Sequence, residues 1–160
     1  MSQSHPILIY TDGASRGNPG PGGYGVVLMT GSLRKELARG YRRTTNNRME
    51  LMAVIAGLAA MKRTGLNITI YSDSQYVVKA VKEGWLNNWI KIGFKGKKNK
   101  DLWMRFHVLA NDQHLKFFWV KGHAENLHNN RCDELATAAA DSRNLLVDEG
   151  YEQDPVNKLL

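Results

Sequence analysis

The order of strands and helices along the chain constrains the fold more than any other feature. Three strand-like segments come first, and helices then alternate with two further strands. The strands are expected at residues 7–10, 26–29, 36–41, 67–71 and 115–120. Strands joined by short turns pair antiparallel, whereas strands separated by a helix cross over and pair in parallel. The order therefore predicts an α/β protein with a mixed five-stranded sheet, an antiparallel meander plus parallel strands, flanked by helices.

Helices are expected at residues 46–62, 75–82, 101–110 and 129–141. Glycine and proline crowd residues 13–25, which predicts a loop there. The stretch from Trp85 to Lys100 is basic and rich in tryptophan, and we interpret it as a protrusion. A length of 160 residues suits one domain. We expect a core over about 6–142 and a C-terminal tail over 143–160 that is a candidate for disorder.

The charge of the chain favours a polyanionic partner. Twenty-two Lys and Arg residues against fifteen Asp and Glu residues give a net charge of +7. Such a balance attracts nucleic acid or a lipid surface, although a basic cluster by itself is also typical of an ordinary solvated surface. No apolar run is long enough to span a membrane, and no signal peptide is recognisable. The single cysteine, Cys132, fits a reducing compartment, so we expect a cytoplasmic protein.

Four carboxylates stand at unusual places in this pattern. Asp12 and Asp73 each follow an apolar strand directly, at the sheet edge where α/β proteins bind ligands. Glu50 is the only acid in an otherwise apolar helix, and Asp133 falls in the first turns of the last helix. Each of them also has a structural explanation as a turn residue, a helix cap or a partner of the helix dipole. Their recurrence at the ends of separate segments favours a shared site.

A converging carboxylate cluster suits a hard divalent cation. Mg²⁺ prefers oxygen ligands and is commonly held by a few carboxylates together with substrate phosphate oxygens. Zinc is disfavoured, because one cysteine and scattered histidines offer no ligand spacing. Acidic ligands on a basic protein therefore suggest hydrolysis of a phosphodiester.

One motif points elsewhere and is set aside. The run Gly20-Pro21-Gly22-Gly23-Tyr24-Gly25 matches the dinucleotide-binding fingerprint letter for letter. That fingerprint must open a helix, whereas a strand-like segment follows here. We therefore expect no nucleotide cofactor.

Six blocks of sequence together resemble bacterial type 1 ribonuclease H. They are Thr11-Asp12-Gly13, Gly17 to Gly25, Thr44 to Leu51, Ser72 to Val77, Trp119 to His123 and Arg131 to Ala136. The blocks occur in the family's order and span nearly the whole chain. The resemblance implies a monomeric endonuclease that hydrolyses the RNA strand of RNA–DNA hybrids by a two-metal-ion mechanism, leaving 5′-phosphate and 3′-hydroxyl ends. It implies Mg²⁺ as the cofactor, with Mn²⁺ as a substitute.

The resemblance also implies residue roles. Asp12, Glu50, Asp73 and Asp133 become the catalytic metal ligands, and His123 becomes an auxiliary catalytic histidine. The expected substrate contacts are Asn18, Asn46, Asn47 and Gln75 in the minor groove, Thr45 and Arg48 at a DNA phosphate, Trp85 at a deoxyribose, and Asn129. Minor-groove amides make chemical sense, because that groove displays base edges and the 2′-hydroxyls that distinguish RNA.

Two departures from the family pattern and two alternatives accompany this interpretation. The loop after His123 differs from the usual Gly-His-Pro-Glu, and the basic protrusion is shorter than in the longest relatives.

The alternatives are a hybrid-binding module without catalysis and a nuclease of the same fold that acts on DNA. The four acids disfavour the first alternative, and the predicted contacts to the RNA strand disfavour the second.

Overall fold

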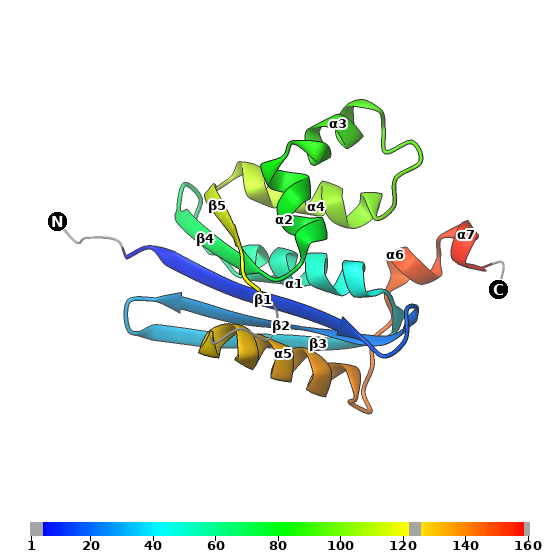
Figure 1. Ribbon diagram of the computed structural model, residues 1–160, viewed down its shortest axis with the longest axis horizontal. Coiled ribbons are helices and arrows are strands. Elements are labelled where there is room, and N and C mark those ends of the chain that lie inside the picture. Colours follow the sequence, from blue (N-terminus) through cyan, green and yellow to red (C-terminus); the bar gives the residue numbers. More distant parts are fainter. Residues whose placement is uncertain (1–4, 122–125, 159–160) are drawn as a thin grey trace.

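A mixed five-stranded sheet forms the centre of the protein (Figure 1). The computed structural model describes residues 5–121 and 126–158. The strands are β1 (Ile7–Ser15), β2 (Gly20–Thr30), β3 (Leu33–Thr44), β4 (Asn67–Ser72) and β5 (His114–Trp119). Their order in the sheet is β3-β2-β1-β4-β5. The first three form an antiparallel meander, and β4 and β5 extend it in parallel, so the predicted fold class is confirmed.

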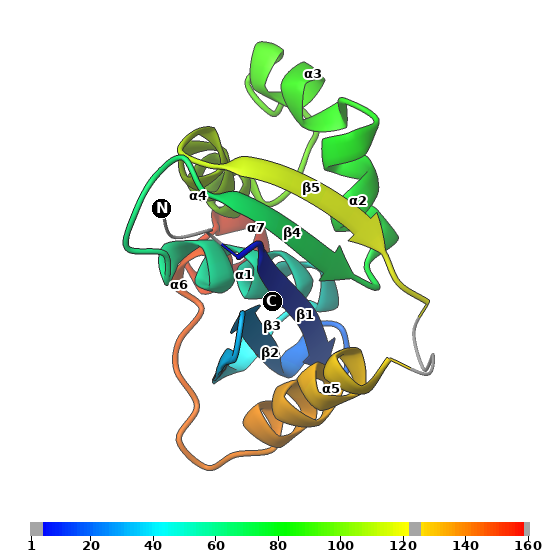
Figure 2. The same cartoon turned by 90° about the vertical axis from the view of Figure 1, so that its left-hand side faces the viewer.

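Helices cover both faces of this sheet. They are α1 (Asn46–Ala59), α2 (Gln75–Lys82), α3 (Trp85–Lys91), α4 (Lys100–Asn111), α5 (Leu127–Ala140), α6 (Glu149–Glu152) and α7 (Pro155–Lys158). Helix α1 lies against β1 and β2 on one face, with α4 packed on it, and α5 crosses β1, β2 and β3 on the other (Figure 2). No helix in the described ranges is long and apolar enough to cross a membrane.

The main core lies between the sheet and α1. Ten of the fourteen residues of α1 are buried, because the sheet covers one side of the helix and α4 the other. This explains its sequence, which is apolar around most of its circumference. Thr45 caps the helix, as its hydroxyl accepts a hydrogen bond from the Arg48 backbone N–H at 3.3 Å. Burial on all sides fixes α1 and the acid that it carries.

The glycine-rich segment differs from its prediction as a loop. Residues from Gly20 onward form β2, and β1 continues to Ser15. Glycine is a poor strand former, but here it lets α5 approach the sheet. A Cβ on Gly25 would lie 2.3 Å from the carbonyl oxygen of Cys132, and one on Gly23 would lie 2.5 Å from that of Ala136. The match to a dinucleotide-binding motif therefore reflects close packing of a helix on a strand.

The C-terminal tail also differs from the expectation of disorder. Over 143–158 it contains α6 and α7, and Leu146 forms a bridge with Tyr41 of β3. Asp148 of the tail is 3% exposed and bonds Arg48 and Thr44. Sequence patterns did not predict these short helices, nor α3 within the basic protrusion. The tail thus packs against the same helix that carries Glu50.

Candidate active site

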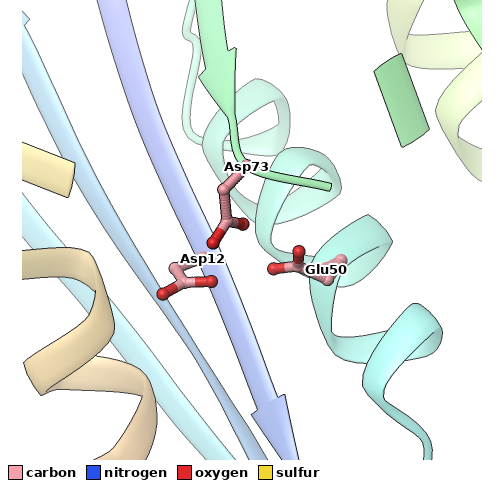
Figure 3. Close-up of side chains that lie close together, drawn as sticks. All are labelled: Asp12, Glu50 and Asp73. Carbon is pink, nitrogen blue, oxygen red and sulfur yellow. The ribbon is translucent and has the colours of Figure 1, made fainter. Parts of the chain in front are cut away.

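Three carboxylates from three separate elements converge at one edge of the sheet (Figure 3). Asp12 lies on β1, Glu50 on α1, and Asp73 directly follows β4. One carboxylate oxygen from each lies within 4.8 Å of the others. The three acids predicted from separate segments therefore form one cluster.

The sheet register places two of these acids side by side. Strands β1 and β4 pair in parallel with Thr11 opposite Ser72, so Asp12 and Asp73 come next on adjacent strands. The cluster therefore lies where β4 ends, beside Asp12 within β1, which continues to Ser15.

Gly13 brings the third acid to the cluster. Its backbone N–H donates to Asp12 Oδ1 at 2.8 Å and also to Glu50 Oε1. A Cβ at this position would lie 2.3 Å from the backbone nitrogen of Glu50. The glycine is therefore required for the close approach of α1 to β1.

The cluster is electrostatically costly without a cation. Asp12 and Glu50 are each only 5% exposed. Burial and the negative charge of Asp73 raise the pKa of Asp12 to about 8. Burial and the charges of Asp12 and Asp73 raise the pKa of Glu50 well above its ordinary value. Like charges in a poorly solvated site disfavour the ionised forms, and a bound divalent cation would reverse that effect.

The unused ligand atoms fit such a cation. Asp73 Oδ1 is a buried oxygen that accepts no hydrogen bond within the described residues. A buried carboxylate oxygen without a donor is costly unless something positive reaches it. The acids line a cavity of about 170 Å³, and Asp133 of α5 borders the same cavity from the exposed side. The donor set, all carboxylate oxygen, is the one that Mg²⁺ or Mn²⁺ prefers.

Three asparagines also line this cavity, the predicted contact Asn46 of α1 and two from α5. Asn129 of α5 was predicted as a substrate contact, and its Oδ1 is buried without a hydrogen-bond donor in the described parts of the chain. Its neighbour Asn130 is exposed and lines the cavity too, although sequence reasoning had not singled it out. The only available signal was its position one turn before Asp133.

Most of the predicted substrate residues lie together at the N-terminus of α1. Asn18 Oδ1 accepts a hydrogen bond from the Asn46 backbone N–H at 3.1 Å, which holds the β1–β2 turn against the helix. Asn18, Thr45 and Asn47 line a groove of about 950 Å³. Lysines 97, 98 and 100 line the same groove, as do Asp101, Glu149 and Asp154. The groove therefore combines amides and a hydroxyl with charged side chains of both signs.

The other predicted contacts lie apart from this groove. Gln75 is exposed at the first turn of α2, next to Asp73. Trp85 begins α3 and is 38% exposed, with its ring centroid 6.4 Å from that of Trp89. His123 lies outside the described residues.

Arg48 does not have the role predicted for it. Its side chain is 3% exposed, and its five N–H groups all point to oxygen acceptors. These acceptors are Asp148, Asp101 and Asn99. No N–H of this guanidinium is left for a DNA phosphate, so Arg48 instead ties α1 to α4 and to the tail. The basic character of its sequence neighbourhood concealed this pairing, because its partners lie 53 and 100 residues away.

The fold and the acid cluster together define a class, that of nucleases with a carboxylate-lined cation site at the end of a mixed sheet. The profile of the RNase H family matches residues 4–141. A "Ribonuclease H" of Syntrophus aciditrophicus is 51% identical over 150 residues, covering 91% of this chain and 86% of that protein.

Solved structures agree. LC9-RNase H1, a type 1 enzyme with a type 2 active-site motif, superposes with a TM-score of 0.78 at 28% identity, covering 99% of this chain and 86% of that one. LC11-RNase H1, solved in complex with an RNA/DNA hybrid, gives a TM-score of 0.65 at 27% identity, covering 84% of this chain and 96% of that one. The chain belongs to the ribonuclease H family, as the sequence blocks predicted. It is an endonuclease that hydrolyses the RNA strand of RNA–DNA hybrids.

Proposed function

We propose that Asp12, Glu50, Asp73 and Asp133 hold two Mg²⁺ ions, with Mn²⁺ as a substitute, and that these residues carry the hydrolysis. The observation that supports this most is the convergence of three carboxylates around Asp73 Oδ1, a buried oxygen without a hydrogen-bond donor among the described residues. Asp133 is exposed on the opposite wall of the same cavity, where it can complete the ligand set as substrate arrives.

When bound, the two ions would supply the chemistry at phosphorus. One ion would activate a water and the other would stabilise the leaving oxygen, which leaves 5′-phosphate and 3′-hydroxyl ends. The residues of this chain determine where that happens. Gly13 orients Asp12 and Glu50 through its N–H, and burial keeps both from turning toward solvent. We assign His123 the auxiliary role of moving a proton or assisting product departure.

The hybrid is proposed to lie across the N-terminus of α1. Asn18, Asn46, Asn47 and Gln75 offer amides to the minor groove, where the 2′-hydroxyls of the RNA strand identify it. We assign Thr45, which lines the same groove as lysines 97, 98 and 100, a contact with a phosphate of the DNA strand. Trp85 and Asn129 complete the proposed contacts. LC11-RNase H1, whose structure holds an RNA/DNA hybrid, supports this substrate class.

We also propose that the enzyme is a cytoplasmic monomer without a nucleotide cofactor. The single cysteine, Cys132, is fully buried on the side of α5 that faces the sheet and offers no thiol for an external bridge. The proposal for the cofactor rests on β2, since the glycine motif there forms a strand instead of opening a helix.

The decisive experiment uses a hybrid with separate labels on its RNA and DNA strands. We expect internal cuts in the RNA strand alone, and only when Mg²⁺ or Mn²⁺ is present. Asp73→Asn should lower the rate by at least about 10³-fold, as loss of transition-state stabilisation of ~4 kcal/mol would. Asp112→Asn, which neutralises an acid at the C-terminal end of α4, is the matched control and should cut normally.

Three outcomes would contradict the proposal. Hybrid binding without cleavage at any metal concentration would favour the non-catalytic module. Cleavage of duplex DNA at a similar rate would favour a DNA nuclease on the same fold. Robust activity of both Asp12→Asn and Asp73→Asn would place the metal site elsewhere.

A further inference from the structure

Three aromatic rings form a continuous stack across the face of the sheet next to the acid cluster. Tyr10 of β1, Tyr71 of β4 and Phe118 of β5 are direct neighbours in the strand register. The centroids of Tyr10 and Tyr71 lie 4.6 Å apart with an interplanar angle of 10°, and those of Tyr71 and Phe118 lie 5.8 Å apart at 24°. The hydrolysis at the carboxylates makes no use of this stack.

The stack opens to solvent at one end. The inner end is closed, because Tyr10 is 8% exposed and the His128 ring of α5 lies 5.0 Å from it. Helix α5 covers β1, β2 and β3, and β4 and β5 extend beyond it (Figure 2). Phe118 therefore ends the stack on the edge strand with 47% of its surface exposed.

Two lysines lie near the exposed Phe118 end of the stack. Lys82 of α2 places its Nζ 5.5 Å from the centroid of the Phe118 ring. Lys116 lies two residues before Phe118 on the same face of β5 and is exposed. An aromatic face with adjacent lysines is the arrangement that binds unpaired nucleotides, because the base stacks on the ring and the ammonium groups pair with the phosphates.

The stack is also close to the scissile position. Tyr10 precedes Asp12 by two residues on the same face of β1, which corresponds to about 7 Å along the strand. Tyr71 precedes Asp73 by the same interval. The RNA strand is the one that is cut at the carboxylates, so we expect its continuation to be the nucleic acid nearest to Phe118. Internal bases of the hybrid are stacked on both faces and cannot present a face to the ring, whereas an unpaired base of an extension can.

We propose that Phe118 and Lys82 form a binding site for an unpaired RNA extension of the strand being cut, with a base stacked on Phe118 as the fourth member of the Tyr10–Tyr71–Phe118 stack. This proposal rests on the assigned activity on RNA–DNA hybrids. It gives the enzyme a preference for hybrids that continue into single-stranded RNA over hybrids with blunt ends.

The test compares one hybrid in four forms: blunt, with a single-stranded RNA extension at the 5′ end of the RNA strand, with the same extension at its 3′ end, and with a single-stranded DNA extension. For the unmodified enzyme, an RNA extension at one end should lower KM about fivefold or more relative to the blunt hybrid, as expected for one stacked base. Phe118→Leu should abolish this advantage, because leucine keeps apolar bulk but has no aromatic face. Phe118→Trp should retain it, and Lys82→Ala should reduce it.

The controls separate this proposal from the activity on which it rests. Val108→Ala alters another exposed apolar side chain, on α4, and should leave the advantage intact. All variants should cut the blunt hybrid with kcat and KM within about twofold of the unmodified enzyme. A blunt hybrid that stays uncut would refute the assigned activity, not this site. An RNA extension without effect, an effect that survives in Phe118→Leu, or an effect of the DNA extension alone would each overturn the proposal.

Discussion

At the scale of single residues, the active site is a place where stability is given up for function. Asp12 and Glu50 are buried beside Asp73 with raised pKa values, and their ionised forms repel one another. The surrounding fold holds them together in spite of this repulsion. Perturbed carboxylates in a small cavity are typical of catalytic sites, and here they also imply a measurable dependence of stability on pH.

The first prediction concerns that dependence in the absence of metal. The pKa of Asp12 rises from an ordinary 3.8 to about 8 on folding. The folded state therefore binds a proton more tightly than the unfolded state, so this contribution is fully present below pH 4 and is lost as pH rises to about 8. In EDTA, Asp12→Asn should be more stable than the unmodified protein at pH 8, with a difference that shrinks toward pH 4. Thermal unfolding across this range measures it, and a difference that stays constant with pH would show that Asp12 does not titrate in this way.

The second prediction concerns the buried ion pair of Arg48 with Asp148. The two side chains are 3% and 2% exposed, and their bonds measure 2.8 and 2.9 Å. Asp148→Ala leaves a buried guanidinium with only Asp101 and Asn99 as partners, which should cost roughly 3–5 kcal/mol of unfolding free energy. Asp141→Ala removes the exposed pair with Arg16 and should cost no more than about 1 kcal/mol. Urea unfolding of both variants checks the contrast, and equal losses would argue against it.

The residue-level predictions from sequence succeeded where a local pattern carried the information. An acid that follows an apolar run, or interrupts an apolar stretch of helix, is visible in the sequence, and Asp12, Asp73 and Glu50 do converge in the structure. The predicted end of the first strand was wrong, because β1 continues past Asp12 to Ser15. Arg48 was misassigned because its partners come from α4 and the tail, and nothing in its neighbours shows that it is buried. Charge alone does not reveal whether a guanidinium faces solvent or a carboxylate.

At the scale of elements, α5 and the strands beneath it depend on glycine. Gly23 and Gly25 of β2 and Gly40 of β3 lie directly under the backbone of α5 or its C-terminal turn. This close packing sets the distance between the helix and the sheet, and therefore the position of Asp133 relative to Asp12. A local rule that assigns glycine to loops missed this packing at Gly23 and Gly25, because the reason for these two glycines is a helix more than a hundred residues away.

The third prediction follows from this close packing. Gly25→Ala introduces a Cβ 2.3 Å from a carbonyl oxygen of α5, so the helix must shift. We expect a stability loss of roughly 1–3 kcal/mol and a fall in kcat from the displacement of Asp133. Gly65→Ala is the control, since its positive φ of 72° makes it strained while no atom of the described residues lies within 4 Å of the new Cβ. It should lose about 1–2 kcal/mol without a change in kcat. Equal kcat values in the two variants would show that α5 does not position the fourth carboxylate.

At the scale of the whole molecule, a cluster of three lysines lies where substrate is proposed to bind. The net charge of +7 favours any polyanion, but lysines 97, 98 and 100 line the groove that also holds Thr45 and Asn18. The architecture itself was predictable, since strand order and crossovers follow from the sequence of elements. Short helices such as α3, α6 and α7 were not, because segments of four to seven residues are stabilised by tertiary contacts more than by their own pattern.

The fourth prediction tests that concentration of charge. Replacing lysines 97, 98 and 100 by alanine should raise KM for the hybrid and flatten its salt dependence, with a slope change of about 0.9 for each phosphate that the protein no longer neutralises. The matched control replaces Lys35, Lys62 and Arg63 by alanine and so removes the same amount of positive charge elsewhere. Lys35 lies near the start of β3, and the other two residues follow the C-terminus of α1. KM measured over a range of salt concentrations distinguishes the two. Identical slopes would mean that net charge, and not its location, governs binding.

The cysteine of α5 is fully buried against the sheet, so its reactivity reports the separation of that helix from the sheet. Cys132 is the single cysteine of the chain, its thiol donates to the Tyr10 carbonyl oxygen, and burial raises its pKa to about 12. A thiol-modifying reagent can reach it only when α5 separates from the sheet. The rate of labelling in native conditions therefore reports how often that separation occurs, without any engineered label. Because Asp133 is the next residue, the same measurement shows how often the site is disassembled, and whether Mg²⁺ or a bound hybrid keeps it closed.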